Sequence, residues 1–567
     1  MSSDTADSAI QTVSPVNVDA ASEPASRFVR SAAQPSLSMA GVSLPPAGAS
    51  PPHAPTPAFV PQSPLVPLPT PATLPSLAPA PALPATTGLP SRRFARLAAG
   101  LGAIDPAKVV AIRDSWRALW SSRLLVWAAG MGTVLTVGFG PVRHAFNPPG
   151  VTRGLGWLGN LLAAPAARWD AAWYLVIAHY GYRPDLGAFT SSRTAFFPLY
   201  PLCLSVISHL GVPPILAGVL LSCGALALAL YGIHRLTTLE LGRTGMSKIP
   251  GAEGEVARLA VLLTAFAPMA FFFSAVYSES LYLALSVGVF LCARQGRWAW
   301  VAALGVLAAA TRSTGVVLLL PAAMLYLYGP REDLAPDFPR SERPRGAPGT
   351  GTGMVAERRA LRLPGVSFML GTAARLRPNY RLRRDFLWLA IVPAGLGIYM
   401  AYLRFSGGDA LMPFHAQDVW GRHFAGPYGG LWDGAKAAFE GARQLLSQGR
   451  HVYFPAAGGS PEIDAGHNLM LLAFLLVAVP MVIGVLRMLP LAYGVYMIAA
   501  LALPLSYPVA SQPLMSLPRF LVVLFPLSIW LAAWLTARPR ARMPVLVGSG
   551  LLMAFFVAQF ATWHWVA

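Results

Sequence analysis

Long apolar runs with almost no charged residues constrain the fold of this chain more than any other feature. The clearest are residues 214–231, 386–402, 470–485 and 545–560, and none of these four contains Asp, Glu, Lys or Arg. A helix needs about 20 such residues to cross the hydrocarbon core of a bilayer. Charged residues make up 12% of the chain, whereas an average soluble domain carries about 25%. We therefore expect an all-α integral membrane protein and exclude a soluble enzyme.

The positive charge of the chain is spread over short clusters between the apolar runs. The formal net charge is +19, which by itself would suit a nucleic-acid-binding protein. However, the Lys and Arg residues do not form one patch, and clusters between apolar runs are typical of cytoplasmic loops. We therefore predict membrane lipids, and no nucleic acid, as the surroundings of these clusters.

The arginines also predict the orientation of the chain. Arg113, Arg117 and Arg123 precede the first apolar run, which places the N-terminus in the cytoplasm and the following loop outside. The next apolar helix, residues 196–210, has about 15 residues and is short for a span. Treating that helix as non-spanning brings every later basic cluster to the cytoplasmic side. The clusters are residues 235–258, 294–297, 331–384, 487 and 538–542.

The hydropathy pattern then predicts about eleven transmembrane helices. Three of them, residues 280–294, 298–312 and 314–328, are short for a bilayer. The predicted spans are residues 124–142, 214–236, 258–277, 280–294, 298–312, 314–328, 386–404, 468–487, 490–508, 519–536 and 544–563.

Five segments follow from this arrangement. Residues 1–104 are rich in Pro, Ala and Ser, a composition that cannot build a core, and are predicted to be a disordered cytoplasmic tail. An amphipathic juxtamembrane segment is predicted at residues 105–123. The remainder divides into an N-terminal transmembrane module, a basic cytoplasmic loop and a C-terminal transmembrane module. Their bounds are residues 124–328 with an outer loop at 143–213, residues 329–385, and residues 386–567 with an outer loop at 405–467.

Asp170 is the first candidate for chemistry. It lies between Trp169 and Trp173, and tryptophan favours the interface between membrane and water. A partly desolvated carboxylate at that level is well placed to accept a proton from a substrate hydroxyl. The alternative is that Asp170 caps the helix that begins there.

Two further ionisable residues lie between strongly apolar runs. Glu279 stands in Tyr277-Ser278-Glu279-Ser280, and an ionisable group at such depth indicates a functional site; a turn at the membrane surface is the alternative. Arg312 is the only charged residue in the sequence between Arg297 and Arg331. Its forked donors match a phosphate group, and a structural ion pair with Glu279 is the competing interpretation.

Other candidates lie on the predicted outer side. Arg422 and His423 could contact an anionic lipid or a sugar, or simply form a solvated loop surface. Arg519 could bind phosphate or extend to the headgroups. The sequence has no His-Glu-x-x-His, no paired Cys-x-x-Cys and no phosphate-binding glycine loop. We therefore expect neither a metal site nor a bound cofactor, and no ATP-driven pump.

Four ordered motifs resemble one family of enzymes. They are Arg168-Trp169-Asp170 with His179-Tyr180-Gly181-Tyr182 and Phe196-Phe197-Pro198-Leu199-Tyr200-Pro201; Phe273-Ser274-Ala275-Val276-Tyr277-Ser278-Glu279-Ser280; Thr311-Arg312-Ser313-Thr314-Gly315; and Leu517-Pro518-Arg519-Phe520. In this order they resemble PIG-V-type mannosyltransferases, which add the second mannose in glycosylphosphatidylinositol assembly. The resemblance runs from about residue 120 onward. The proline-rich tail and the arginine-rich insertion at 331–384 depart from it.

The resemblance implies a GT-C glycosyltransferase fold, with membrane-parallel helices in the first outer loop and an active site outside the membrane. It implies inverting transfer of mannose from a polyprenyl-phosphate donor to a lipid-linked or glycolipid acceptor, with Asp170 as the base. We assign Arg312 and Arg519 to the donor phosphate from their charge and placement. Further substrate-binding candidates are Arg168, Trp169, Trp173, Tyr200, Tyr277, Glu279, Arg422 and His423.

The composition also bears on the acceptor and the location. The abundance of Ala, Pro and Arg is typical of a GC-rich bacterial genome, which argues against glycosylphosphatidylinositol as the acceptor and predicts a bacterial plasma membrane. A donor carrying another sugar is the first alternative. A transporter or flippase of lipid-linked glycans and a non-catalytic assembly partner are the others. Oligomeric state is not predicted by the sequence.

Overall fold

The computed structural model describes residues 105–141, 155–183, 187, 189–244, 252–337, 378–447 and 460–566. The chain divides into two compact units, Met1–Gly88 and Leu89–Ala567, and every described residue belongs to the second. The predicted disordered tail, residues 1–104, therefore lies outside the described residues. So does most of the predicted basic loop.

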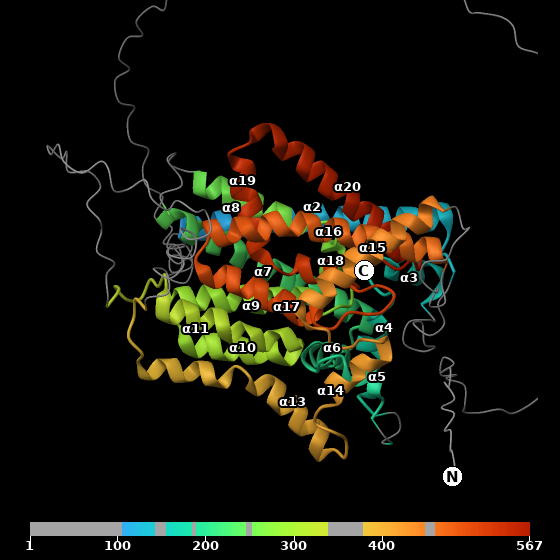
Figure 1. The fold of residues 1–567 in the computed structure, drawn as a ribbon, viewed down its shortest axis with the longest axis horizontal. Helices are drawn as coiled ribbons and strands as arrows, with labels where there is room; N and C mark the ends of the chain where they lie inside the picture. Colours follow the sequence, from blue (N-terminus) through green and yellow to red (C-terminus); the bar gives the residue numbers. More distant parts are fainter. Residues whose placement is uncertain are drawn as a thin grey trace, which may run out of the picture. The chain divides into compact units, whose positions relative to one another are not determined.

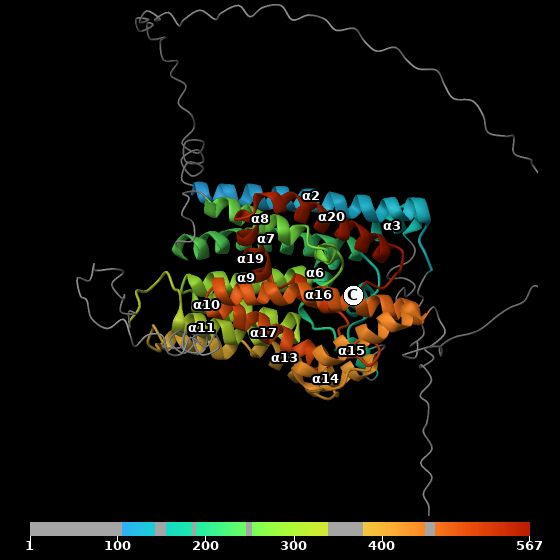
Figure 2. The same cartoon turned by 45° about the horizontal axis from the view of Figure 1, so that its top comes forward.

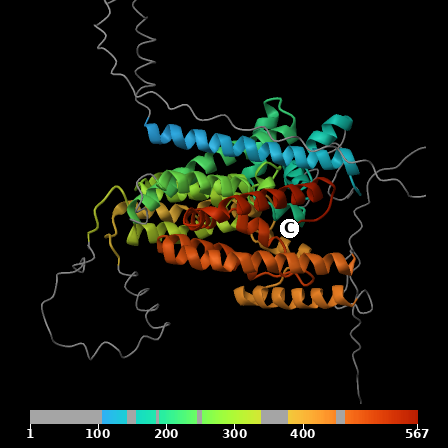
Figure 3. The ribbon, with the colours of Figure 1, turned by 90° about the horizontal axis from the view of Figure 1, so that it is seen from above.

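Helices form nearly all of the regular structure in the described part of the chain. The only β-type pairing there is an isolated bridge between Arg422 and Val509. Long helices lie side by side in a bundle (Figure 1), and α2 lies on the opposite side of it from α15 and α16 (Figure 3). The main helices are α2 Pro106–Val137, α7 Pro214–Thr244, α8 Ala252–Ala265, α9 Glu279–Arg294, α10 Trp298–Thr311, α11 Leu319–Tyr328, α13 Ala394–Phe405, α15 Gly426–Leu446, α16 Pro461–Met488, α17 Leu491–Leu505, α19 Phe525–Thr536 and α20 Pro539–Ala561.

Four helical stretches of the described residues are long and apolar enough to cross a membrane: Pro214–Gly242, Arg384–Phe405, Pro461–Met488 and Pro539–Ala561. The other apolar helices are shorter, and they include α10, α17 and α19. The all-helical prediction is thus confirmed and the chain has the helices of a membrane protein. The number of eleven spans remains a prediction, although helical segments occupy all eleven predicted positions.

The first predicted span and the juxtamembrane segment before it are one continuous helix, α2, of 32 residues. Asp105 begins it by accepting a hydrogen bond from the amide of Ala107 at 3.0 Å. Arg123 was expected to be a basic residue at the flank of a span. It is instead buried within the bundle, where its guanidinium has three protein partners outside α2.

Those partners explain why the predicted span at 258–277 is broken. Helix α8 ends at Ala265, and only a short 3-10 turn, η3 Ala270–Phe273, follows before α9. Arg123 donates to the carbonyls of Ala265 and Ala270 at 3.0 and 2.8 Å, and to the Ser274 hydroxyl at 2.8 Å. A buried carbonyl without a partner is costly, so the guanidinium stabilises the break. The break brings Tyr277 and Glu279 into the interior.

The loop between α2 and α7 contains short helices at one end of the bundle, on the right in Figure 1. Helix α6 has 11 residues, which gives it a length of about 16 Å, roughly half the thickness of the hydrocarbon core. This agrees with the predicted non-spanning helix at 196–210, although its direction relative to a membrane stays a prediction. The four helices of this loop are α3 Gly156–Ala163, α4 Ala171–Tyr180, α5 Ser191–Thr194 and α6 Leu199–His209.

The segment that follows α13 continues on the same side of the molecule. It comprises α14 Met412–His415, the 3-10 helix η6 Ala416–Trp420 and then α15. Helix α14 lies close to α5 (Figure 1) and on the side of the bundle away from α2 (Figure 2), and the Thr194 hydroxyl donates to the Met412 carbonyl at 3.4 Å. The two predicted outer loops therefore meet, and the candidate site lies where they do.

Candidate functional site

Four charged side chains from four distant parts of the chain meet at one point. Nη1 of Arg519 donates to Oδ2 of Asp170 at 2.7 Å, and its Nε and Nη2 donate to Oε1 of Glu279 at 3.1 and 2.8 Å. Nη2 of Arg312 donates to the same Glu279 oxygen at 3.0 Å. Two carboxylates and two guanidinium groups balance in charge, which a buried cluster requires. We call these four residues the ion cluster.

Arg519 is the centre of the ion cluster. It lies on α18, Leu517–Val522, a short helix that begins after Ser516, a residue in the left-handed backbone region with φ 68°. The Arg519 guanidinium also stacks over the rings of Phe272 and Tyr277, with 5.0 and 4.9 Å to the ring centroids. These aromatic rings hold the planar guanidinium in an orientation in which its N–H groups donate to both Asp170 and Glu279.

Asp170 occupies the N-cap position of α4, yet its side chain makes no capping hydrogen bond. The side chain of Asp170 therefore does not cap α4, because its carboxylate accepts a hydrogen bond from Arg519 instead. The side chain is 17% exposed. The preceding residue, Trp169, has φ 54°. Such backbone strain is costly and is frequent near functional sites.

Glu279 is the buried acid of the ion cluster. It is the first residue of α9, where a negative charge interacts favourably with the helix dipole. Its side chain is fully buried, and its Oε2 atom has no hydrogen-bond partner among the described residues. Ser278, beside it, pairs with the Tyr174 hydroxyl at 2.9 Å, which fixes α4 against the start of α9.

Arg312 lies at the break between α10 and the 3-10 helix η4, Ser313–Leu318, with extended backbone angles. Gly315 permits this break, because a Cβ atom there would lie 2.1 Å from the Ala308 carbonyl group. The ion pair with Glu279 that was one of the two interpretations of Arg312 is present. The guanidinium is nonetheless 16% exposed, and only its Nη2 atom donates to Glu279.

Arg422 lies at the edge of the ion cluster. It is half-buried, and its Nη1 atom donates to the Tyr507 carbonyl at 3.1 Å. Burial lowers the pKa of the Arg422 guanidinium to about 10; the charge of Arg519 also lowers this pKa and that of Asp170 raises it. Arg422 therefore stays positively charged at neutral pH and acts electrostatically on both residues.

An aromatic wall adjoins Asp170. Trp173 follows it by three residues on α4, so the two side chains lie on one face of the helix. The Trp173 ring stacks on Phe196 with 5.8 Å between centroids, and Phe196 contacts Trp420 edge-on at 6.1 Å. The Trp173 indole nitrogen is buried and has no hydrogen-bond partner in the described part of the chain.

Two of the predicted substrate-binding residues are held by the segment after α20. The Trp169 indole nitrogen donates to the His564 carbonyl at 3.3 Å, and its ring lies 6.0 and 5.2 Å from the rings of Trp563 and Trp565. Arg168 donates to the Ala561 carbonyl at 3.2 Å and stacks over Trp563. These contacts support the loop that carries Asp170. Sequence reasoning missed Trp563 and Trp565, although two tryptophans so close together were a visible signal.

Tyr277 and Tyr200 connect the loop to the bundle. The Tyr277 hydroxyl donates to the Arg168 carbonyl at 3.0 Å, and its ring also contacts Arg519. The buried Tyr200 hydroxyl pairs with Ser222 at 2.8 Å and donates to the Gly218 carbonyl at 3.2 Å. Tyr200 therefore joins α6 to α7, and its hydroxyl bonds to α7 rather than to the ion cluster.

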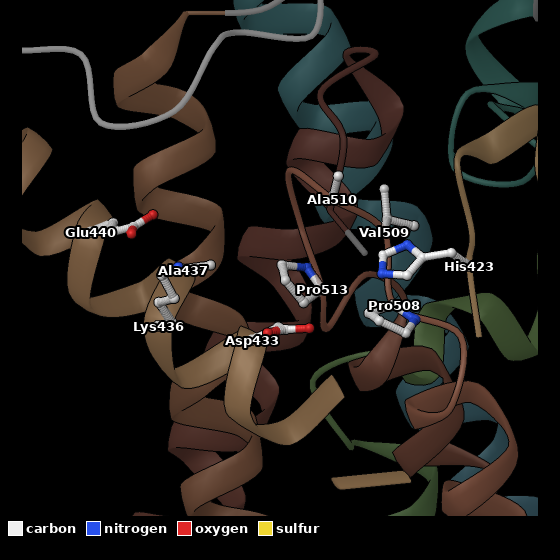
Figure 4. A pocket seen from close by; sticks show the side chains of 9 residues that line it. All are labelled: His423, Asp433, Lys436, Ala437, Glu440, Pro508, Val509, Ala510 and Pro513. Carbon is white, nitrogen blue, oxygen red and sulfur yellow. The ribbon is translucent and has the colours of Figure 1, made fainter. Parts of the chain in front are cut away.

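His423 lies outside the ion cluster, in a hollow between α15 and residues 508–513 (Figure 4). The hollow has a volume of about 140 Å³, and three other polar side chains line it, those of Asp433, Lys436 and Glu440. No group of three or more His, Cys, Asp or Glu side chains that could hold a metal ion occurs among the described residues.

The comparisons with known proteins agree with the resemblance. Residues 144–327 match the family model described as "Mannosyltransferase (PIG-V)". This region contains Asp170, Glu279 and Arg312, whereas Arg422 and Arg519 lie beyond it. No curated protein and no solved structure matches the chain. The part of the chain that carries both acids of the ion cluster is thus similar to PIG-V-type mannosyltransferases.

Proposed function

We propose that the protein is a membrane-embedded, GT-C-type mannosyltransferase that uses a polyprenyl-phosphate mannose donor and a lipid-linked or glycolipid acceptor. The family match over residues 144–327 supports transfer of mannose in a membrane. The observation that carries the proposal further is the ion cluster, since it joins a partly exposed acid to two arginines in one buried site.

The arginines provide the site for the donor phosphate. Guanidinium groups match phosphate oxygens in shape and charge. Arg312 uses one nitrogen on Glu279 and keeps its other donors for a ligand, while Arg422 adds a third positive charge at the edge. Without donor, Glu279 supplies the negative charge that these arginines need. A bound phosphate takes over part of that role.

Asp170 is the base in this scheme. Arg519 holds its Oδ2 atom, and the second carboxylate oxygen accepts the proton of the acceptor hydroxyl. The hydroxyl oxygen attacks the anomeric carbon of mannose and forms the new glycosidic bond. The bond from that carbon to the phosphate oxygen breaks, so polyprenyl phosphate leaves with the electron pair. One displacement of this kind inverts the anomeric configuration.

The aromatic wall supplies the surface for a sugar ring. Trp173, Phe196 and Trp420 are each partly exposed, and aromatic faces pack well against the C–H face of a pyranose. The unpartnered Trp173 indole N–H adds a donor for a hydroxyl group. Because Trp173 and Asp170 share one face of α4, a sugar on this wall lies beside the proposed base.

The test uses membranes that contain the full-length protein, radiolabelled polyprenyl-phosphate mannose and a membrane lipid extract. We expect label transfer that Asp170→Asn reduces at least a hundredfold, since a positioned general base contributes about 10²–10⁴-fold. Asp418→Asn is the matched control, because Asp418 is an exposed carboxylate outside the ion cluster.

Undiminished transfer by Asp170→Asn would refute the proposed base. If polyprenyl-phosphate glucose is used in preference to the mannose donor, the proposed sugar is wrong. Absence of transfer from either donor would refute the enzyme and leave the transporter as the hypothesis to test.

A further inference from the structure

The hollow beside His423 has no role in the chemistry described so far. It lies between α15 and the segment 508–513 (Figure 4). Its volume of about 140 Å³ exceeds that of several water molecules, each of which takes about 30 Å³ in the liquid. The hollow therefore suits one small ring-sized group and not a whole lipid.

Charged side chains of α15 line one wall of the hollow, and apolar residues together with His423 line the other. Asp433, Lys436 and Glu440 share one face of α15 by their spacing of three and four residues. Val509 and Pro513 face them across the hollow. None of the three α15 side chains forms a hydrogen bond or an ion pair with the described part of the chain. Binding sites for small polar molecules combine these two kinds of wall.

The charges of the lining indicate which kind of ligand fits. Two carboxylates and one ammonium group give the α15 wall a net charge of about −1. A phosphate would be repelled by the carboxylates. A hydroxyl group, in contrast, donates to a carboxylate and accepts from an ammonium group. The ligand chemistry that fits is therefore an uncharged sugar, with its hydroxyls on the polar wall and its C–H face on the apolar one.

The hollow adjoins the ion cluster through two consecutive residues. His423 lines the hollow, and Arg422 lies at the edge of the ion cluster and acts on Asp170. The same backbone is fixed to the opposite wall, since the amide of His423 donates to the Pro508 carbonyl at 3.3 Å. The hollow is thus next in the chain to a residue that acts electrostatically on the proposed base.

Close backbone packing keeps the hollow in shape. A Cβ atom at Gly430 of α15 would lie 2.2 Å from the Leu505 carbonyl oxygen, and one at Gly434 would lie 2.5 Å from Leu514. These glycines let α15 approach the end of α17 and the loop after it. The two walls of the hollow are held at a fixed separation, as a preformed binding site requires.

We propose that this hollow binds an uncharged, hydroxyl-bearing sugar of the acceptor, next to the site that binds the donor phosphate. The assignment of this sugar to the acceptor rests on the proposed glycosyltransferase function. Binding of a sugar in the hollow can nevertheless be measured without any transfer.

The experiment measures binding of butyl α-mannoside and butyl β-glucoside to the full-length protein in lipid nanodiscs, by saturation-transfer NMR. Butyl phosphate serves as the anionic probe. We expect saturable binding of at least one glycoside, weakened tenfold or more in the double variant Asp433→Asn/Glu440→Gln. Asp418→Asn, which removes a carboxylate outside the hollow, should change the dissociation constant less than twofold.

Two results would overturn the inference. One is glycoside binding that the double variant leaves unchanged, and the other is butyl phosphate binding that the double variant abolishes. Donor hydrolysis to free mannose provides the separate test of the proposed function. Glycoside binding without any donor turnover refutes the transferase alone. Transfer with an unchanged acceptor KM in the double variant refutes the hollow alone.

Discussion

Glu279→Gln is the substitution that tests the electrostatics of the ion cluster most directly. Glutamine keeps the shape of the side chain, and its carbonyl oxygen can still accept the three N–H contacts that reach Oε1 of Glu279. The negative charge is lost. Arg312 and Arg519 then face Asp170 alone, so the cluster changes from neutral to a net charge of +1 in a buried place.

The size of the effect follows from burial. Glu279 is fully buried and Arg519 is 7% exposed, so removal of one partner leaves a charge that water cannot solvate. Breaking a buried ion pair in this way costs about 3–5 kcal/mol. We expect the lower end, about 3 kcal/mol, because the hydrogen bonds can persist. Thermal unfolding of the variant should therefore begin several degrees lower.

An anionic ligand should reverse this loss if the arginines bind the donor phosphate. Farnesyl phosphate supplies the negative charge that Glu279→Gln has lost. In this variant the phosphate also no longer competes with the Glu279 carboxylate for the two arginines. Ligand at 100 times its dissociation constant stabilises a protein by about 2.7 kcal/mol. Farnesyl phosphate should thus raise the unfolding temperature of Glu279→Gln more than that of the wild-type protein, while mannosyl transfer by the variant falls.

Glu240→Gln is the matched control for this measurement. Glu240 is equally buried and forms an ion pair with Arg294 and a hydrogen bond with Tyr493. This variant should lose stability as well, yet farnesyl phosphate should rescue it no more than it stabilises the wild-type protein. Equal stabilisation of all three proteins would refute the assignment of Arg312 and Arg519 to the donor phosphate.

Two further predictions concern the support of the loop and its side of the membrane. Trp565→Ala removes a ring that packs on Trp169, so we expect kcat to fall about tenfold or more through misplacement of Asp170, with an unchanged KM for the donor. Trp534→Ala, on an exposed tryptophan of α19, is the control, and a raised KM at constant kcat would contradict a positioning role. For the orientation, a cysteine introduced at Ser191 should react with an impermeant maleimide from outside, and one at Glu332 should react only after the membrane is opened. The reverse pattern would show that the predicted cytoplasmic N-terminus is wrong.

The members of the ion cluster could be found in the sequence because charge is rare in this chain. Glu279, Arg312 and Arg519 each stand out against apolar neighbours. Which of these residues contact one another could not be predicted from the sequence in the same way. Arg519 is separated by 349 residues from Asp170 and by 240 from Glu279, and hydropathy gives the depth of a residue but not its neighbours in the plane of the membrane.

Local sequence patterns gave wrong roles to residues whose side chains are placed by tertiary contacts. Arg123 was predicted to be a basic residue at the flank of a span, since its position before an apolar run is typical of one, but its guanidinium donates to the broken end of α8. Arg168 and Trp169 were grouped with Asp170 as substrate-binding residues because they are adjacent. Successive residues at the start of a helix point in different directions, and these two side chains turn to the last residue of α20 and the segment after it.

The charge balance of the site explains why the matched region is not enough by itself. Residues 144–327 contain two acids of the ion cluster but only one of its arginines. Two carboxylates beside one guanidinium would leave a net charge of −1, which would repel the donor phosphate and cost free energy on burial. Arg519 restores neutrality and Arg422 adds positive charge at the edge. The proposed phosphate site therefore requires that the C-terminal helices pack on the matched region, so we expect variants that weaken this packing to lose stability and donor binding together.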